Sequence, residues 1–72
     1  MTAPTGEQLL AFEAANRKHT SRKEAEIPRQ LGIAPARYYQ LLGRLIQCED
    51  ALRIDPMLTH ALRRQAAARI TR

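Results

Sequence analysis

Apolar residues recur along the chain at the three- to four-residue spacing of amphipathic helices, with no run that alternates as a strand does. Thr5 and Gln8 have the spacing of a capping box, which predicts the start of a first helix. Leu9 and Phe12 then lie on one helical face. We therefore expect a first helix over residues 6–18.

A second helix is predicted over residues 22–31. Ser21 and Glu24 have capping-box spacing, and Gly32, which tolerates a left-handed backbone, ends the apolar run. Pro28 lies inside this segment, where a proline removes one backbone hydrogen bond and crowds the carbonyl of the preceding turn. We expect a kink at Pro28 or a short separate helix that begins there.

Two further helices follow from the positions of prolines. Pro35 suits the first position of a helix, and an apolar face continues from it, which predicts a helix over residues 35–47. Asp55 stands where an N-cap belongs, directly before another proline, and predicts a last helix over residues 56–70. Residues 48–54, between these two helices, are expected to form a loop or an irregular turn.

Charge narrows the class of partner. The 72 residues make one small domain and include twelve Lys and Arg against seven Asp and Glu, a net charge of +5. So large a positive net charge on so small a protein favours polyanions as partners. The single cysteine, Cys48, excludes an internal disulfide and is expected to be a packing residue, and we expect no metal and no cofactor. With neither a signal peptide nor an apolar run long enough for a membrane span, we expect a cytoplasmic, nucleoid-associated protein and no membrane partner.

The middle of the chain has the layout of a DNA-binding helix-turn-helix. Two predicted helices are joined by a short turn that contains Gly32, and the second of them would place its exposed face in the major groove of double-stranded DNA. The expected fold is thus a small, all-α domain of three to four helices that contains a helix-turn-helix. The apolar corner beneath the motif would comprise Ile27, Leu31, Ile33, Tyr38 and Leu41.

Four residues on the polar side of the third helix are candidates for reading bases: Ala36, Arg37, Gln40 and Arg44. Arg37 has the forked guanidinium that pairs with guanine O6 and N7, and Gln40 has the amide that pairs with adenine N6 and N7. Ala36 offers a methyl group for contact with thymine. This chemistry predicts a sequence-reading protein, most simply a small transcriptional regulator.

A second set of residues is expected to contact the sugar-phosphate backbone: Arg17, Lys18, Arg22, Lys23, Tyr39, Arg63 and Arg64. The first four flank the start of the second helix, where a helix-turn-helix crosses the DNA backbone. Tyr39 could equally pack against the first or last helix, because Tyr38 is the expected core residue of the pair. Together with Arg69 and Arg72, the arginines near the C-terminus could instead form a minor-groove arm or a solvated end.

The segments ARYYQLL at residues 36–42, DPML at residues 55–58 and LRR at residues 62–64 resemble a family of short uncharacterised actinobacterial and actinophage proteins described as helix-turn-helix-like. The resemblance covers about residues 8–70. It implies a DNA-binding fold rather than a particular activity. The sequence departs from the family pattern after Phe12, where aromatic residues are absent, and at Pro28.

Other classes of function are weighed against DNA binding. An enzyme is not expected, because His19 and His60 are the only histidines and form no catalytic or metal-ligand spacing, and no small-molecule substrate is evident. The alternative is a protein-binding adaptor that docks on the transcription machinery through an exposed apolar patch of Tyr39, Leu42 and Ile46. Leu42, Ile46 and Leu58 could instead form the seam of a homodimer, in which two motifs would bind adjacent half-sites.

Overall fold

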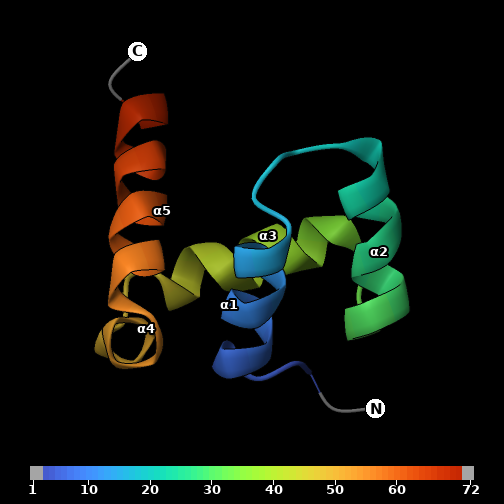
Figure 1. The fold of residues 1–72 in the computed structure, drawn as a ribbon, viewed down its shortest axis with the longest axis horizontal. Helices are drawn as coiled ribbons and strands as arrows, with labels where there is room; N and C mark the ends of the chain where they lie inside the picture. The colour runs from blue at the N-terminus through green and yellow to red at the C-terminus, as the bar shows by residue number, and fades with distance from the viewer. Residues whose placement is uncertain (1–2, 71–72) are drawn as a thin grey trace.

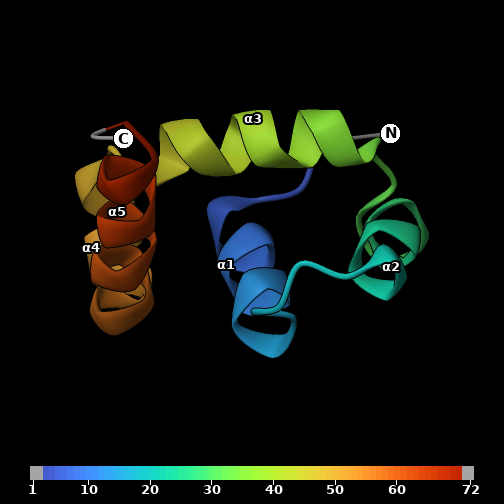
Figure 2. The same cartoon turned by 90° about the horizontal axis from the view of Figure 1, so that it is seen from above.

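The computed structural model describes the backbone of residues 3–70 and the side chains of residues 3–68, and this part of the chain is all-helical, without strands. The helix α3 runs across the molecule, and Figure 2 shows the other four helices on the same side of it. One long face of α3 is therefore left uncovered. The helices in order, as seen in Figure 1, are α1 (Gly6–Ala15), α2 (Ser21–Leu31), α3 (Pro35–Leu45), α4 (Glu49–Ile54) and α5 (Pro56–Ile70).

The first helix begins at the predicted capping box and ends earlier than predicted. The backbone N–H of Gln8 donates to Oγ1 of Thr5 over 3.1 Å, and the backbone N–H of Thr5 donates to the Gln8 side chain over 2.8 Å. At the other end, the Asn16 side chain donates to the carbonyl of Phe12, and its backbone N–H donates to Glu13. These bonds satisfy the last carbonyls of α1, so the helix stops at Ala15 and not at residue 18.

The second helix has a different N-cap from the one predicted. Thr20, not Ser21, accepts the backbone N–H of Lys23, over 3.1 Å, so Ser21 is the first residue of the helix. The helix is continuous through Pro28, which excludes a separate helix beginning there. Gly32 ends it with a φ of 72°, the left-handed conformation that glycine adopts without steric cost.

Residues 49–54 form the short helix α4 and not the expected loop. Glu49 and Asp50 lie in its first turn, where their negative charges interact favourably with the positive end of the helix dipole. The buried Thr59 of α5 donates from Oγ1 to the carbonyl of Ala51 over 2.9 Å and so joins the two helices.

Asp55 caps α5 as predicted, by accepting the backbone N–H of Leu58. The neighbouring Cys48 is exposed, so the expectation that it packs inside is wrong.

The core collects the apolar faces of all five helices. Tyr38 and Ile27 are completely buried, as the predicted corner between α2 and α3 requires. The other residues predicted for this corner are partly buried and pack against the core: Leu31, Ile33 and Leu41. The buried apolar residues are Leu9, Leu10, Phe12, Ile27, Tyr38, Leu42, Ile46, Ala51, Leu58 and Leu62. Because this set contains Leu42, Ile46 and Leu58, neither the apolar adaptor patch nor the apolar dimer seam predicted from the sequence lies on the surface.

Candidate nucleic-acid interface

The uncovered face of α3 carries all four predicted base-reading residues. Ala36, Arg37, Gln40 and Arg44 are exposed, and at about 100° per residue they lie on the side of the helix opposite the buried Tyr38, Leu42 and Ile46. We call these four residues the α3 face. The apolar side of α3 is held against the other helices, which leaves the α3 face directed outward (Figure 2).

The α3 face is cationic and its arginines have no acidic partner. Nη1 of Arg37 donates to Oε1 of Gln40 over 2.8 Å, which orients the two side chains together. Arg37 and Arg44 form no ion pair within the described residues, whereas Arg53 is paired with acidic residues of α4. The sequence from residue 27 to residue 48 contains no acid at all, so the positive charge of this face is not neutralised locally.

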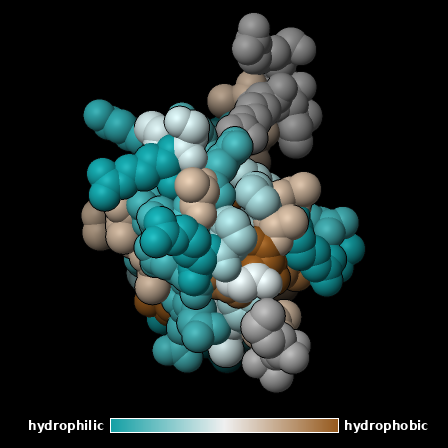
Figure 3. Space-filling view, turned by 90° about the vertical axis from the view of Figure 1, so that its right-hand side faces the viewer, coloured by the Kyte–Doolittle hydropathy of each residue, from teal (hydrophilic) through white to brown (hydrophobic). Residues whose placement is uncertain are grey.

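Three of the predicted phosphate-binding residues gather at the start of α2. Arg17, Lys18 and Arg22 are exposed, and all three line a shallow hollow of about 310 Å³ beside the N-cap Thr20. The first turn of α2 adds backbone N–H groups, which favour anions at a helix N-terminus. Figure 3 views the molecule from the side on which α2 lies, and hydrophilic side chains cover most of that surface.

Lys23, also predicted to contact phosphate, is not available to a ligand. Its side chain is 1% exposed, and its Nζ lies 2.7 Å from Oε1 of Glu13, which is buried as deeply. Tyr38 donates its hydroxyl to the same oxygen over 2.6 Å. An ammonium buried and paired in this way could reach a phosphate only by leaving Glu13 buried without its counter-charge, which is strongly destabilising, so the prediction that Lys23 contacts phosphate is wrong.

Burial in this cluster also changes the acidity of Tyr38. Loss of solvent around its ring disfavours the phenolate and raises the pKa of Tyr38 well above its ordinary value of 10.0. The hydrogen bond to Glu13 and the negative charge of that carboxylate raise it further. Tyr38 therefore stays protonated and keeps donating its hydroxyl hydrogen to Glu13 through the neutral range.

Tyr39 lies half-buried between the α3 face and the interior. Its hydroxyl is 3.3 Å from Nδ1 of His19, and its ring packs edge-on against Tyr38 with centroids 5.0 Å apart. These contacts, with the loop residue His19 and with Tyr38, are neither the phosphate contact nor the packing against the first or last helix that the sequence suggested. His19 follows α1 in the chain, and no sequence pattern links it to Tyr39.

The two C-terminal arginines predicted to contact phosphate differ in their surroundings. Arg63 is half-buried and donates to the backbone carbonyls of Ile46 and Cys48, just beyond the end of α3. Its guanidinium thus caps α3, so the prediction of a free phosphate contact is wrong for Arg63. Arg64 is exposed. The side chain of Arg69, and Arg72, lie outside the described residues.

No cluster of three or more His, Cys, Asp or Glu side chains with the arrangement of a metal site occurs in the described part of the chain. None of the helices in this part has the length and apolar character to cross a membrane.

Comparison with known proteins identifies a family. Neither the curated proteins nor the solved structures contain a significant match to this chain. A family model described as "Protein of unknown function (DUF3263)" matches residues 3–72, which is almost the whole chain. The chain therefore belongs to the DUF3263 family.

Proposed function

We propose that this protein binds double-stranded DNA as a small transcriptional regulator, with the α3 face in the major groove. The observation that carries the proposal is the exposed side of α3. It bears two arginines without acidic partners beside a glutamine, within a stretch of 22 residues (27–48) that has no acid. A protein surface of this kind attracts polyanions and repels basic partners.

The geometry of α2 and α3 supports a helix-turn-helix. The left-handed Gly32 turns the chain sharply, Pro35 begins α3, and the buried Ile27 and Tyr38 hold the two helices together. With eleven residues, α3 is about 16 Å long, and a helix of this kind enters a major groove about 12 Å wide.

The side chains of the α3 face have the donor and acceptor groups for base edges. Arg37 would donate to guanine, Gln40 would pair with adenine, and Arg44, two turns after Arg37, would reach the next bases or a phosphate. The hydrogen bond between Arg37 and Gln40 is made in the absence of DNA. It would orient the guanidinium for a bidentate contact and so reduce the entropy lost on binding.

The phosphate contacts in this proposal come from Lys18, Arg22 and the exposed Arg17, whose guanidinium also pairs with Glu13 at 4.0 Å, because Lys23 and Arg63 are bound within the fold. Neutralising about three phosphates would make the logarithm of the binding constant fall with the logarithm of salt concentration at a slope of about −3. The hollow beside the start of α2 would receive the DNA backbone while α3 occupies the groove.

The test is fluorescence anisotropy of a labelled duplex at two salt concentrations. We expect salt-dependent binding by the parent protein, and binding at least about tenfold weaker by the double variant Arg37→Ala, Arg44→Ala. The matched control is the double variant Arg29→Ala, Arg53→Ala, which also removes two exposed arginines, both of them paired with acidic residues. If the control loses as much affinity as the Arg37→Ala, Arg44→Ala variant, net charge alone explains the loss. No binding by the parent protein at low salt would refute the proposal.

Sequence reading has its own test, because base contacts and phosphate contacts respond differently to substitution. A preferred site would first be selected from random duplexes. Arg37→Ala and Gln40→Ala should then weaken binding to that site and relax the preference for one base pair each, by about 1 to 3 kcal/mol. Lys18→Ala should weaken binding to all duplexes alike. An unchanged preference in both α3 variants would contradict sequence reading.

A homodimer stays a prediction, and it would need a seam other than Leu42, Ile46 and Leu58, which are buried within one chain. Sedimentation of the protein with and without the selected duplex decides it: the mass of a single chain without DNA, and of one chain per duplex with DNA, would contradict a dimer.

A further inference from the structure

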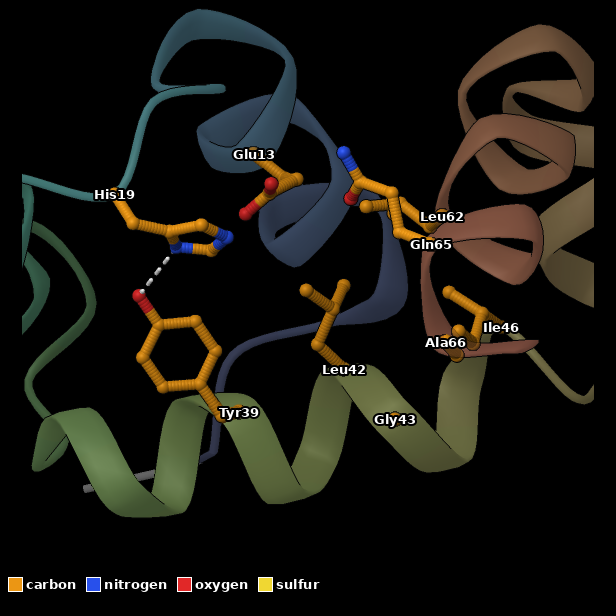
Figure 4. A pocket seen from close by; sticks show the side chains of 9 residues that line it. All are labelled: Glu13, His19, Tyr39, Leu42, Gly43, Ile46, Leu62, Gln65 and Ala66. Carbon is orange, nitrogen blue, oxygen red and sulfur yellow. Dashed lines mark hydrogen bonds between the residues drawn. The ribbon is translucent and has the colours of Figure 1, made fainter. Parts of the chain in front are cut away.

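A pocket of about 160 Å³ lies between the inner side of α3 and helices α1 and α5. Figure 4 shows its lining side chains, which come from three helices and from His19 in the loop after α1. One wall is apolar and is formed by Leu42 of α3, by Ile46 directly after α3, and by Leu62 and Ala66 of α5. The pocket is separate from the α3 face, which lies on the other side of the same helix.

Polar groups line the pocket mainly at the end away from α5, and Gln65 of α5 adds an amide group at the other end. The carboxylate of Glu13 and the ring of His19 lie at the end away from α5, and the Tyr39 hydroxyl is held near His19 by their hydrogen bond (Figure 4). The pocket is thus amphipathic, with hydrocarbon at one end and a carboxylate and an imidazole at the other. Small-molecule sites commonly combine apolar walls with a few converging polar groups in this manner.

The two carboxylate oxygens of Glu13 are used differently by the protein. Oε1 accepts hydrogen bonds from both Lys23 and Tyr38. Oε2 forms an ion pair with Nε of Arg17 at 4.0 Å, which is too long for a hydrogen bond, and no residue of the described part of the chain donates a hydrogen bond to it. A side chain that is 2% exposed therefore keeps one oxygen able to accept a hydrogen bond from a ligand in the pocket.

We propose that this pocket binds a small planar aromatic molecule of one or two fused rings that donates an N–H to Oε2 of Glu13. Size limits the ligand, since a cavity of about 150 Å³ in a protein interior accommodates benzene. The ring would lie between the apolar side chains of α3 and α5. The donor is required because a carboxylate accepts hydrogen bonds only, and a ligand without one would cover Oε2 without giving it a hydrogen bond.

The test compares two ligands of one shape, indole, which has an N–H, and benzofuran, which has none. Titration of ¹⁵N-labelled protein with indole should give saturable shifts of amide signals in residues 39–46 and 62–66. Benzofuran should bind at the same place about tenfold more weakly, because it cannot satisfy the charged acceptor. Shifts that do not saturate or that spread over the whole surface, or equal affinity for both compounds, would overturn the proposal.

A pocket-filling variant localises the binding. Ala66→Leu places a larger side chain in the pocket and should weaken indole binding at least about tenfold, whereas Ala68→Leu, at an exposed position of the same helix, should leave it unchanged. If Ala66→Leu does not fold, Gly43→Leu takes its place, since a Cβ added at Gly43 meets no atom within 4 Å. Undiminished indole binding in a folded filling variant would overturn the proposal. None of these outcomes depends on whether the α3 face binds DNA.

Discussion

The Nζ of Lys23 lies 2.7 Å from Oε1 of Glu13, and neither side chain is more than 2% exposed. The same oxygen accepts the hydroxyl of Tyr38, so one carboxylate joins α1, α2 and α3 in the interior of the domain. Two of these helices are the proposed helix-turn-helix. The buried pair thus holds the proposed DNA-binding unit to the rest of the fold and takes one lysine away from the surface.

Removal of the lysine alone should strongly destabilise the protein. Lys23→Met leaves the Glu13 carboxylate buried without its counter-charge, and we expect the free energy of unfolding to fall by about 3 to 5 kcal/mol. Urea denaturation followed by circular dichroism measures this free energy of unfolding. For a domain of this size such a loss would leave much of the chain unfolded at room temperature.

The double variant Glu13→Gln, Lys23→Met tests whether the instability of Lys23→Met comes from the unpaired charge of Glu13 or from lost packing. It removes both charges, and the glutamine carbonyl oxygen still accepts the Tyr38 hydroxyl. We expect it to recover most of the stability lost in Lys23→Met. A double variant as unstable as the single one would show that the unpaired charge is not the cause.

Alkaline pH should destabilise the protein through Tyr38. Its pKa is raised in the folded state by burial and by the hydrogen bond to Glu13, whereas in the unfolded chain it ionises near pH 10. The stabilisation is complete below that pH and is lost as the pH rises, because the unfolded state then releases a proton that the folded state keeps. Urea midpoints measured from pH 8 to about pH 11 should decline more steeply for the parent than for Tyr38→Phe. Parallel curves would contradict the assignment.

Arg63 and Arg64 are adjacent arginines with different expected effects on stability. Arg63→Ala removes the donors to the carbonyls of Ile46 and Cys48 and should lower the free energy of unfolding by about 1 to 3 kcal/mol. Arg64→Ala, at an exposed position, should change it by less than about 0.5 kcal/mol. Thermal melts of the two variants compare them directly, and equal stabilities would refute the capping role of Arg63.

The N-cap of α2 provides a second matched pair. Thr20→Ala removes the acceptor for the backbone N–H of Lys23 and should cost about 1 kcal/mol, whereas Ser21→Ala should be nearly neutral or slightly stabilising. Chemical denaturation of both variants is sufficient. A larger loss for Ser21→Ala than for Thr20→Ala would move the N-cap back to the residue predicted from the sequence.

Sequence patterns located helices best where a local signal determines the backbone. The capping box at Thr5, the left-handed Gly32 and the cap at Asp55 all act within a few residues, and the structure has each of them. The pattern failed for α4, which has six residues and no side-chain cap at Cys48. Its one available signal was the pair of acids in its first turn.

The site was harder to predict because its polar residues depend on tertiary contacts. The exposed positions of α3 follow from helical periodicity, so Arg37 and Gln40 could be placed on one face. Lys23 could not, because its burial depends on Glu13, ten residues earlier in the chain. A signal did exist: Glu13 lies four residues after Leu9, on the apolar side of α1, where an acid needs a buried partner.

The order in which the helices pack has a consequence for the speed of folding. The helices α2 and α3 are consecutive in the chain and pack on each other, as do α4 and α5, while α1 joins the two pairs through α3 and α4. Domains built from helices that are near one another in sequence fold within microseconds to milliseconds. Synthesis takes roughly 50 ms or more for each residue. We therefore expect this chain to reach its native structure, once it has left the ribosome, in less time than the addition of one amino acid.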